Sequence, residues 1–185
     1  MDKPYLKKDS KKVFSCPWFS INQTSFTRKY TNLTYYANLT YNIVEKEDSV
    51  FIIPVLNSKI VLVKLFRYPT DKWSLELPAG GTDGETPIYA ALRELQEETG
   101  YSTNSIKKLK EFYIAPGITN NKCHIFLAEN LIKTDNNKQE EEGIVSLEKL
   151  SISNIDDYIN KGIINDGPTI TCLYYYKLYE KQRLR

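Results

Sequence analysis

The sequence is poor in several residue types, and each shortage excludes a class of protein. Its three cysteines, Cys16, Cys123 and Cys172, are odd in number and widely spaced. They therefore make neither a disulfide framework nor a Cys-x-x-Cys metal site. A single histidine, His124, excludes a multi-histidine metal centre. We expect three reduced thiols, which suits a cytoplasmic protein.

Long apolar runs and an excess charge of one sign are also missing. No apolar stretch approaches the ~20 residues of a membrane span, and the N-terminus lacks the apolar core of a signal peptide. The chain has 25 Lys and Arg against 23 Asp and Glu, a net charge of +2, so its overall field favours no particular partner. At 185 residues it is long enough for one compact core. We expect no membrane association.

A glycine-rich loop leads into one acidic helix between residues 77 and 100. The loop contains Pro78, Gly80, Gly81 and Gly84. These residues allow tight turns and a close approach of the backbone to a ligand. Thr86 suits the N-cap, Pro87 suits the first helical position, and Gly100 suits the end of the helix. The spacing therefore predicts a helix directly after the loop.

Three glutamates gather on one side of this helix. Glu94, Glu97 and Glu98 fall within a sector of roughly 100°. The predicted buried face consists of Ile88, Ala91, Leu92, Leu95 and Thr99. Like charges one turn apart repel, and Arg93 can relieve part of the repulsion by pairing with Glu97. Two interpretations stay open: a solvated polar face, or a site for a hard cation such as Mg²⁺, which takes oxygen ligands from carboxylates and substrate phosphates.

The segment resembles a Nudix box. That pattern is Gly, five residues, Glu, seven residues, Arg-Glu, an aliphatic residue, any residue, Glu-Glu, any residue, Gly and an apolar residue. From Glu85 to Tyr101 the match is complete. Gly80 lies only four residues before Glu85, so the loop is one residue shorter than the pattern. The helix geometry does not depend on this difference.

The flanks of the box are similar to those of ADP-ribose and other nucleoside-diphosphate-sugar pyrophosphatases. The similarity lies in residues 65–80 before the box and 112–119 after it, where Pro116 stands sixteen residues after Gly100. It covers roughly residues 17–150. The resemblance implies a Nudix α/β/α sandwich, of the α/β (α+β) class with a mixed sheet.

The resemblance also implies a set of metal-binding and catalytic residues. Mg²⁺ or Mn²⁺ would be held by Glu94, Glu97, Glu98 and the carbonyl oxygen of Ala79. Glu94 and Glu98, one turn apart, are the first candidates, and Arg93 would orient the glutamates. A general base is expected in a later loop that contains Glu140, Glu141 and Glu142. The alignment does not choose among these three, and a solvated acidic loop is the alternative for each.

Substrate contacts are implied at five further positions. Arg67 would hold phosphates or the terminal sugar, with a surface ion pair as the alternative, and Glu76 would hold a ribose hydroxyl. Trp18 or a neighbouring aromatic residue, Phe19 or a tyrosine, is a candidate for stacking on the base, although an aromatic ring is more often part of a core. Pro116 and Gly117 are expected to line the substrate site.

Along the chain, the patterns predict three parts. Residues 1–12 are expected to be a flexible basic tail, residues 13–47 an N-terminal β-strand subdomain that the resemblance links to dimer formation, and residues 48–185 the Nudix domain. Strands are predicted over 50–56 and 59–66, joined by a turn at Asn57-Ser58, and over 107–114 and 122–129. Residues 145–159 and 169–184 are predicted to contain helices.

The sequence thus predicts a metal-dependent hydrolase that converts ADP-ribose to AMP and ribose 5-phosphate. Another nucleotide sugar, such as a GDP- or ADP-hexose, is the alternative substrate, and a non-catalytic nucleotide-sugar sensor is the alternative of a different class. The lysine-rich start raises RNA-cap hydrolysis as a third option, but lysines spread over a short tail make a weak footprint. We expect a small-molecule nucleotide substrate and a homodimer, with no nucleic-acid partner.

Overall fold

The computed structural model describes residues 4–29 and 36–183. The chain divides into two compact units. The N-terminal unit comprises residues 1–47 together with 113–121, and the C-terminal unit comprises residues 48–112 together with 122–185. Residues 113–121, expected in the C-terminal domain, group with the N-terminal unit.

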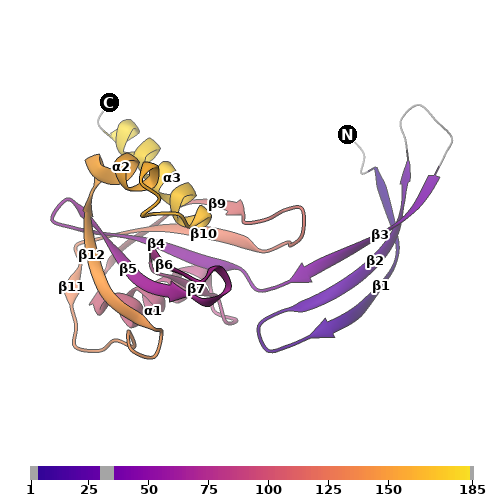
Figure 1. The fold of residues 1–185 in the computed structure, drawn as a ribbon, viewed down its shortest axis with the longest axis horizontal. Coiled ribbons are helices and arrows are strands. Elements are labelled where there is room, and N and C mark those ends of the chain that lie inside the picture. The colour runs from indigo at the N-terminus through magenta and orange to yellow at the C-terminus, as the bar shows by residue number, and fades with distance from the viewer. Residues whose placement is uncertain (1–3, 30–35, 184–185) are drawn as a thin grey trace. The chain divides into compact units, whose positions relative to one another are not determined.

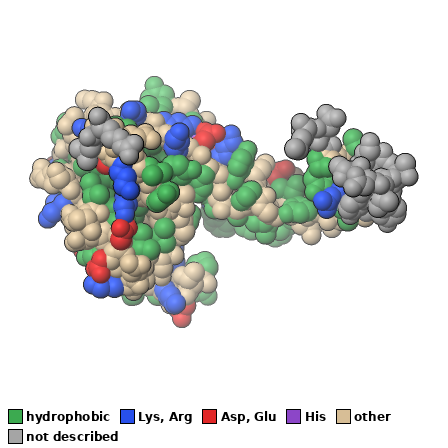
Figure 2. Space-filling view, turned by 90° about the horizontal axis from the view of Figure 1, so that it is seen from above, with side chains coloured by type: hydrophobic (Ala, Val, Ile, Leu, Met, Phe, Trp, Pro, Cys, Tyr) green, Lys and Arg blue, Asp and Glu red, His purple; other side chains and the backbone are tan. Residues whose placement is uncertain are grey.

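The N-terminal unit is an antiparallel sheet in the order β1-β2-β3 (Figure 1). Its strands are β1 (Tyr5–Ser15), β2 (Ser20–Lys29) and β3 (Tyr36–Glu45). Residues 5–12, expected to belong to a flexible tail, instead lie in β1 and pair with β2; residues 1–3 lie outside the described part. Among the described residues of this unit, no hydrophobic side chain is buried, and Figure 2 shows hydrophobic side chains at its surface.

Residues 113–121 join this unit through β3. The backbone N–H of Val44 donates to the carbonyl oxygen of Ile118 at 2.9 Å, and Val44 forms a parallel bridge with Thr119. The hydroxyl of Tyr41 donates to the carbonyl oxygen of Gly117. Pairing of this kind is set by tertiary contacts, which explains why local sequence patterns did not indicate it.

The C-terminal unit is built on a seven-stranded mixed sheet with the path β12-β5-β4-β10-β9, to which β6 adds on β5 and β7 on β4. The strands are β4 (Ser49–Leu56), β5 (Lys59–Arg67), β6 (Lys72–Glu76), β7 (Ala79–Gly81), β9 (Ser105–Tyr113), β10 (Lys122–Glu129) and β12 (Ile144–Ser151). Strands β4 and β10 run parallel, whereas β5 runs antiparallel to β4, β6 and β12. Two short strands, β8 (Tyr101–Ser102) and β11 (Ile132–Lys133), pair separately.

Helices cover both faces of this sheet. Helices α1 (Pro87–Thr99) and α3 (Gly167–Arg183) lie on opposite sides, and the short α2 (Ile155–Asn160) precedes α3 (Figure 1). One core cluster joins α1 to β4 and β10; its members are Val50, Ile52, Ala90, Ala91, Leu95, Phe126 and Ala128. Helix α3 buries Thr169, Cys172, Leu173 and Tyr176. Within the described residues, no helix is both long and apolar enough to cross a membrane.

The structure confirms three local predictions and corrects one. The β4–β5 turn at Asn57-Ser58 is present, with φ of 50° and 60°, as a two-residue hairpin turn requires. Helix α1 begins at Pro87 as predicted. Ile88, assigned to its buried face, is 42% exposed. The segment 145–159 contains the predicted helix as part of α2, but its first half, residues 145–151, belongs to β12, which pairs with β5.

Candidate active site

The ends of α1 fix where its glutamates point. Thr86 holds the N-cap position with extended backbone, φ −67° and ψ 146°, although its side chain makes no capping hydrogen bond. The Thr86 carbonyl oxygen accepts the N–H of Ala90 at 3.1 Å. Gly100 ends the helix at φ 65°, in the left-handed region that favours glycine. These residues therefore set where the helix begins and ends.

Two of the three glutamates point into the unit. Glu94 and Glu98 are only 6% and 8% exposed, and they face strand β7. Glu98 Oε2 accepts the backbone N–H of Ala79 at 2.9 Å. A Cβ atom at Gly80 would overlap the Glu94 carboxylate, so only glycine lets the loop approach this closely. The structure thus contradicts a solvated polar face at these two positions.

Burial disfavours the charge on both carboxylates. Burial raises the pKa of Glu98 to about 8, while the Ala79 N–H lowers it and the charges of Glu94 and Glu142 raise it further. Burial also raises the pKa of Glu94, against the lowering effect of Arg93. A nearby positive charge would favour the ionised forms of both carboxylates. Their oxygens are therefore a donor set that fits a hard divalent cation.

Arg93 ties the loop to the helix. Its guanidinium donates to Glu85 Oε2 at 2.7 Å, to Glu94 Oε1 at 2.6 Å and to the Gly81 carbonyl oxygen at 3.0 Å. The predicted pair with Glu97 is present at 3.3 Å. A planar fork with five donors can bridge several oxygens at once, so Arg93 sets the position of Glu94 relative to the loop.

Glu97 points toward a different element. It forms an ion pair with Lys138, whose backbone N–H also donates to the Glu97 carbonyl oxygen at 2.8 Å. Burial alone would raise the pKa of Glu97, but the hydrogen bonds from Lys138 and Arg93 outweigh it and lower the pKa. Over residues 4–29 and 36–183, no three His, Cys, Asp or Glu side chains form a ready metal cage. Mg²⁺ needs only one or two carboxylates when phosphates complete its shell, so a pair such as Glu94 and Glu98 could hold it. The metal roles of Glu94, Glu97 and Glu98 all stay predictions.

The later acidic loop follows Lys138. Its three glutamates differ in their electrostatic effect on the buried pair. The charge of Glu142 raises the pKa of both Glu94 and Glu98, whereas Glu141 raises the pKa of Lys138. The structure therefore singles out Glu142 as a loop glutamate whose charge reaches both buried carboxylates.

Arg67 and Glu76 form a two-pronged ion pair at the edge of this site. Arg67 Nε donates to Glu76 Oε1 at 2.9 Å and Nη2 donates to Oε2 at 2.6 Å. This bond to Glu76 raises the pKa of Arg67, and the Arg67 charge in turn lowers the pKa of Glu98. Glu76 is buried, while about half of the Arg67 side chain stays accessible. The guanidinium can therefore still donate to an anionic ligand.

The first turn of α3 supports the loop from behind, a feature that sequence reasoning missed. Thr169 is fully buried, and its Oγ1 accepts the backbone N–H of Leu77 at 3.1 Å. Asp166 Oδ2 accepts the backbone N–H of Thr169 at 2.8 Å. The order Asp-Gly-Pro-Thr, residues 166–169, is a helix-start signal. It could have identified Asp166 as a helix cap, but it could not have shown that Thr169 binds the backbone of Leu77.

The remaining predicted contacts lie in the other unit. Trp18 is exposed in the turn between β1 and β2, and Pro116 and Gly117 belong to the segment 113–121. The carboxylate pair, Arg67 and Glu76 all belong to the C-terminal unit. The substrate roles of Trp18, Pro116 and Gly117 therefore stay predictions.

Residues 45–165 match the NUDIX domain family. The chain belongs to the Nudix family. It is 33% identical over 141 residues to the ADP-ribose pyrophosphatase of Bacillus subtilis, covering 75% of this chain and 76% of that protein. It is also 33% identical over 131 residues to the GDP-mannose pyrophosphatase of Yersinia enterocolitica, covering 66% and 69%. The predicted family resemblance is thus confirmed.

The fold of this Nudix hydrolase is shared with a solved structure. The crystal structure of an ADP compounds hydrolase superposes with a TM-score of 0.83, covering 98% of this chain and 96% of that chain at 19% identity. The predicted mixed α+β Nudix fold is therefore confirmed.

Proposed function

We propose that the protein hydrolyses the pyrophosphate bond of nucleoside diphosphate sugars, with ADP-ribose as the first substrate and AMP and ribose 5-phosphate as products. The observation that carries this proposal is the buried pair Glu94 and Glu98, held against the Gly80 loop beside an accessible Arg67. The relatives named ADP-ribose and GDP-mannose pyrophosphatase support the substrate class.

Glu94 and Glu98 would hold Mg²⁺ or Mn²⁺, together with the Ala79 carbonyl oxygen that the family resemblance implies. When bound, such a cation neutralises phosphate charge and lowers the pKa of a bound water. Arg93 keeps Glu94 in place, and the Ala79 N–H orients Glu98 through Oε2. These contacts fix the donor oxygens before substrate arrives, which reduces the cost of ordering them.

Other side chains of the site bind substrate and move protons. Arg67, fixed by Glu76, is oriented to donate to phosphate oxygens. Glu142 is our choice for the general base, because its charge already acts on the buried pair and its loop is exposed. A base in this position takes the proton of the attacking water.

A product screen tests the proposal. Purified protein is incubated with Mg²⁺ and ADP-ribose, ADP-glucose or GDP-mannose, and the released monophosphate is quantified. We expect the fastest turnover with ADP-ribose; a rate below a tenth of that for a hexose substrate would assign the protein to the nucleotide-hexose class instead, as the GDP-mannose relative favours. Turnover no faster than that of Glu98→Gln on every substrate would show a non-catalytic sensor.

We further propose that the protein is a homodimer formed through the N-terminal unit. The faces of its three-stranded sheet carry exposed aromatic side chains, and a hollow of about 470 Å³ on it is lined in part by Tyr5, Phe26, Tyr41 and Pro116. A three-stranded sheet needs its apolar face covered to be stable, and a second copy would cover it. Sedimentation analysis should give twice the monomer mass, and Tyr41→Lys should shift it to the monomer.

The free thiols support a cytoplasmic setting, which we also propose. Cys123 and Cys172 are buried, in contact and unjoined, and thiols of this kind persist in a reducing compartment. Fractionation of cells that express a tagged chain would test this location.

A further inference from the structure

A second hollow, of about 320 Å³, lies behind the strands that carry Arg67 and Glu76. In the β5–β6 pair, Lys64 stands opposite Leu75, and Trp73 lies two residues before Leu75. Because successive side chains of a strand point to opposite faces, Lys64, Leu75 and Trp73 point away from the face of Arg67 and Glu76. This hollow is therefore separate from the carboxylate site.

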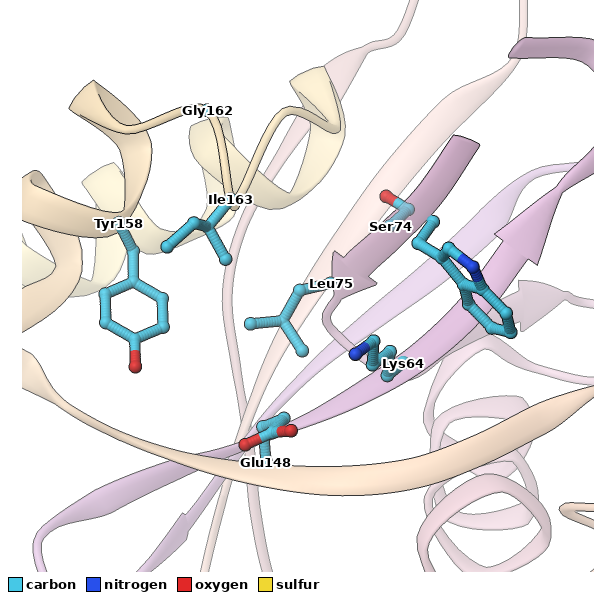
Figure 3. Close-up of a pocket in the computed structure, with 8 residues that line it drawn as sticks. Lys64, Ser74, Leu75, Glu148, Tyr158, Gly162 and Ile163 are labelled. Carbon is cyan, nitrogen blue, oxygen red and sulfur yellow. The ribbon is translucent and has the colours of Figure 1, made fainter. Parts of the chain in front are cut away.

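Apolar and polar side chains line the hollow together (Figure 3). Leu75, which is buried, lies between Ile163 and Lys64 in this view. Tyr158 comes from α2, and Glu148 comes from β12. Strands β5, β6 and β12 and helix α2 thus converge on one small space.

Its charged groups are not engaged with each other. The Lys64 ammonium lies over the ring of Trp73, 5.9 Å from the centroid, and Trp73 is 53% exposed. Across the described ranges, neither Lys64 nor Glu148 makes an ion pair or a side-chain hydrogen bond. An indole ring offers a stacking surface for a planar group, an ammonium binds an anion, and a carboxylate accepts hydrogen bonds from hydroxyl or amino groups.

We propose that this hollow binds a nucleoside monophosphate. The base would stack on Trp73, the phosphate would pair with Lys64, and Glu148 would accept hydrogen bonds from the ribose hydroxyls. A volume of about 320 Å³ is at the low end of ligand pockets, which span roughly 300–1,000 Å³, so it suits a mononucleotide better than a whole nucleotide sugar. The choice of ligand rests on the proposed function, because that hydrolysis releases a nucleoside monophosphate.

Trp73 fluorescence reports on this hollow directly. The chain has two tryptophans, so a Trp18→Phe protein leaves Trp73 as the single indole. Titration with AMP in EDTA should quench its fluorescence saturably. Lys64→Gln should weaken the affinity about tenfold, since a hydrogen bond to a charged group is lost. Lys59→Gln, an exposed lysine on the same strand, should leave the affinity unchanged.

Titrations with adenosine and with inorganic phosphate test the two halves of the ligand separately. Adenosine should quench with lower affinity than AMP, and phosphate alone should not quench. The titration is repeated in Glu98→Gln, where quenching should persist. Quenching by AMP in a protein that hydrolyses no substrate would support this hollow and refute the proposed function. A hydrolase whose Trp73 fluorescence AMP does not change, or changes equally in Lys64→Gln, would overturn the inference and leave the function standing.

Discussion

The burial of Glu98 makes a prediction about stability that is independent of any enzyme assay. Its ordinary pKa is 4.5, and in the folded protein burial raises it to about 8. Between these two values the folded chain holds a proton that the unfolded chain has lost. The stability that this group contributes is therefore fully present below pH 4.5 and is lost as the pH rises through about 8.

The size of this effect follows from the same two values. One pKa unit corresponds to about 1.4 kcal/mol, so the difference between 4.5 and about 8 sets an upper bound of roughly 5 kcal/mol on the stability lost. Glu98→Gln keeps the shape of the protonated acid but cannot ionise. In metal-free buffer we expect it to match the wild type near pH 5 and to be clearly more stable near pH 8.5.

The assay is urea unfolding in EDTA across this pH range, followed by Trp73 fluorescence in a Trp18→Phe protein so that the C-terminal unit alone is observed. Glu97→Gln, at the adjacent position of the same helix, is the matched control. Its pKa is lowered in the fold, so that substitution should destabilise the protein at neutral pH instead of stabilising it. Parallel curves of unfolding free energy against pH for the wild type and Glu98→Gln would refute the reasoning.

Three further substitutions test other parts of the site. Thr169→Val removes a buried acceptor and leaves the N–H before the loop unpaired, so we expect a loss of about 1–3 kcal/mol of unfolding free energy by urea titration. Gly80→Ala places a Cβ atom on the Glu94 carboxylate, which should abolish Mn²⁺ binding measured by calorimetry while the far-ultraviolet circular dichroism stays unchanged. Glu142→Gln should lower kcat by about 10²–10⁴-fold, whereas Glu140→Gln should have a small effect.

Each of these has a control. Thr169→Ser keeps the hydroxyl and should retain most of the stability; equal losses in both variants would assign the effect to packing alone. Gly84→Ala, where an added Cβ has free space but the backbone is at φ 78°, separates loop strain from overlap with the carboxylate. A normal kcat for Glu142→Gln would move the base to another residue.

Local sequence signals predicted those elements whose boundaries are set by a few neighbouring residues. The Asn57-Ser58 turn and the helix from Pro87 to Gly100 each depend on backbone preferences that single residues carry. Strand β12 depends on pairing with β5, more than seventy residues earlier. Periodicity over residues 145–159 could not reveal that partner, because tertiary pairing overrides local propensity.

The helical wheel found only one of the two buried sides of α1, although Ala91, Leu95 and Thr99 are buried as predicted. It predicted a buried apolar face on one side of the helix and an exposed acidic face on the other, with Ile88 on the buried side. The helix in fact packs on the sheet through Ala90, Ala91 and Leu95, while the β7 loop covers Glu94 and Glu98. A wheel assumes one buried face, whereas a helix held between a sheet and a loop has two. The carboxylates could be named from their spacing, but their burial could not.

This burial couples the stability of the fold to its proposed chemistry. In EDTA, the folded chain bears the cost of burying Glu94 and Glu98, which Arg93 and Arg67 offset only in part. A cation that binds the folded state alone adds about 2.7 kcal/mol at one hundred times its dissociation constant, and the gain should grow with pH because protons compete for the same oxygens. Mg²⁺ should therefore stabilise the wild type more at pH 8 than at pH 6, and should barely affect Glu98→Gln. A gain of equal size in both proteins would place the cation elsewhere.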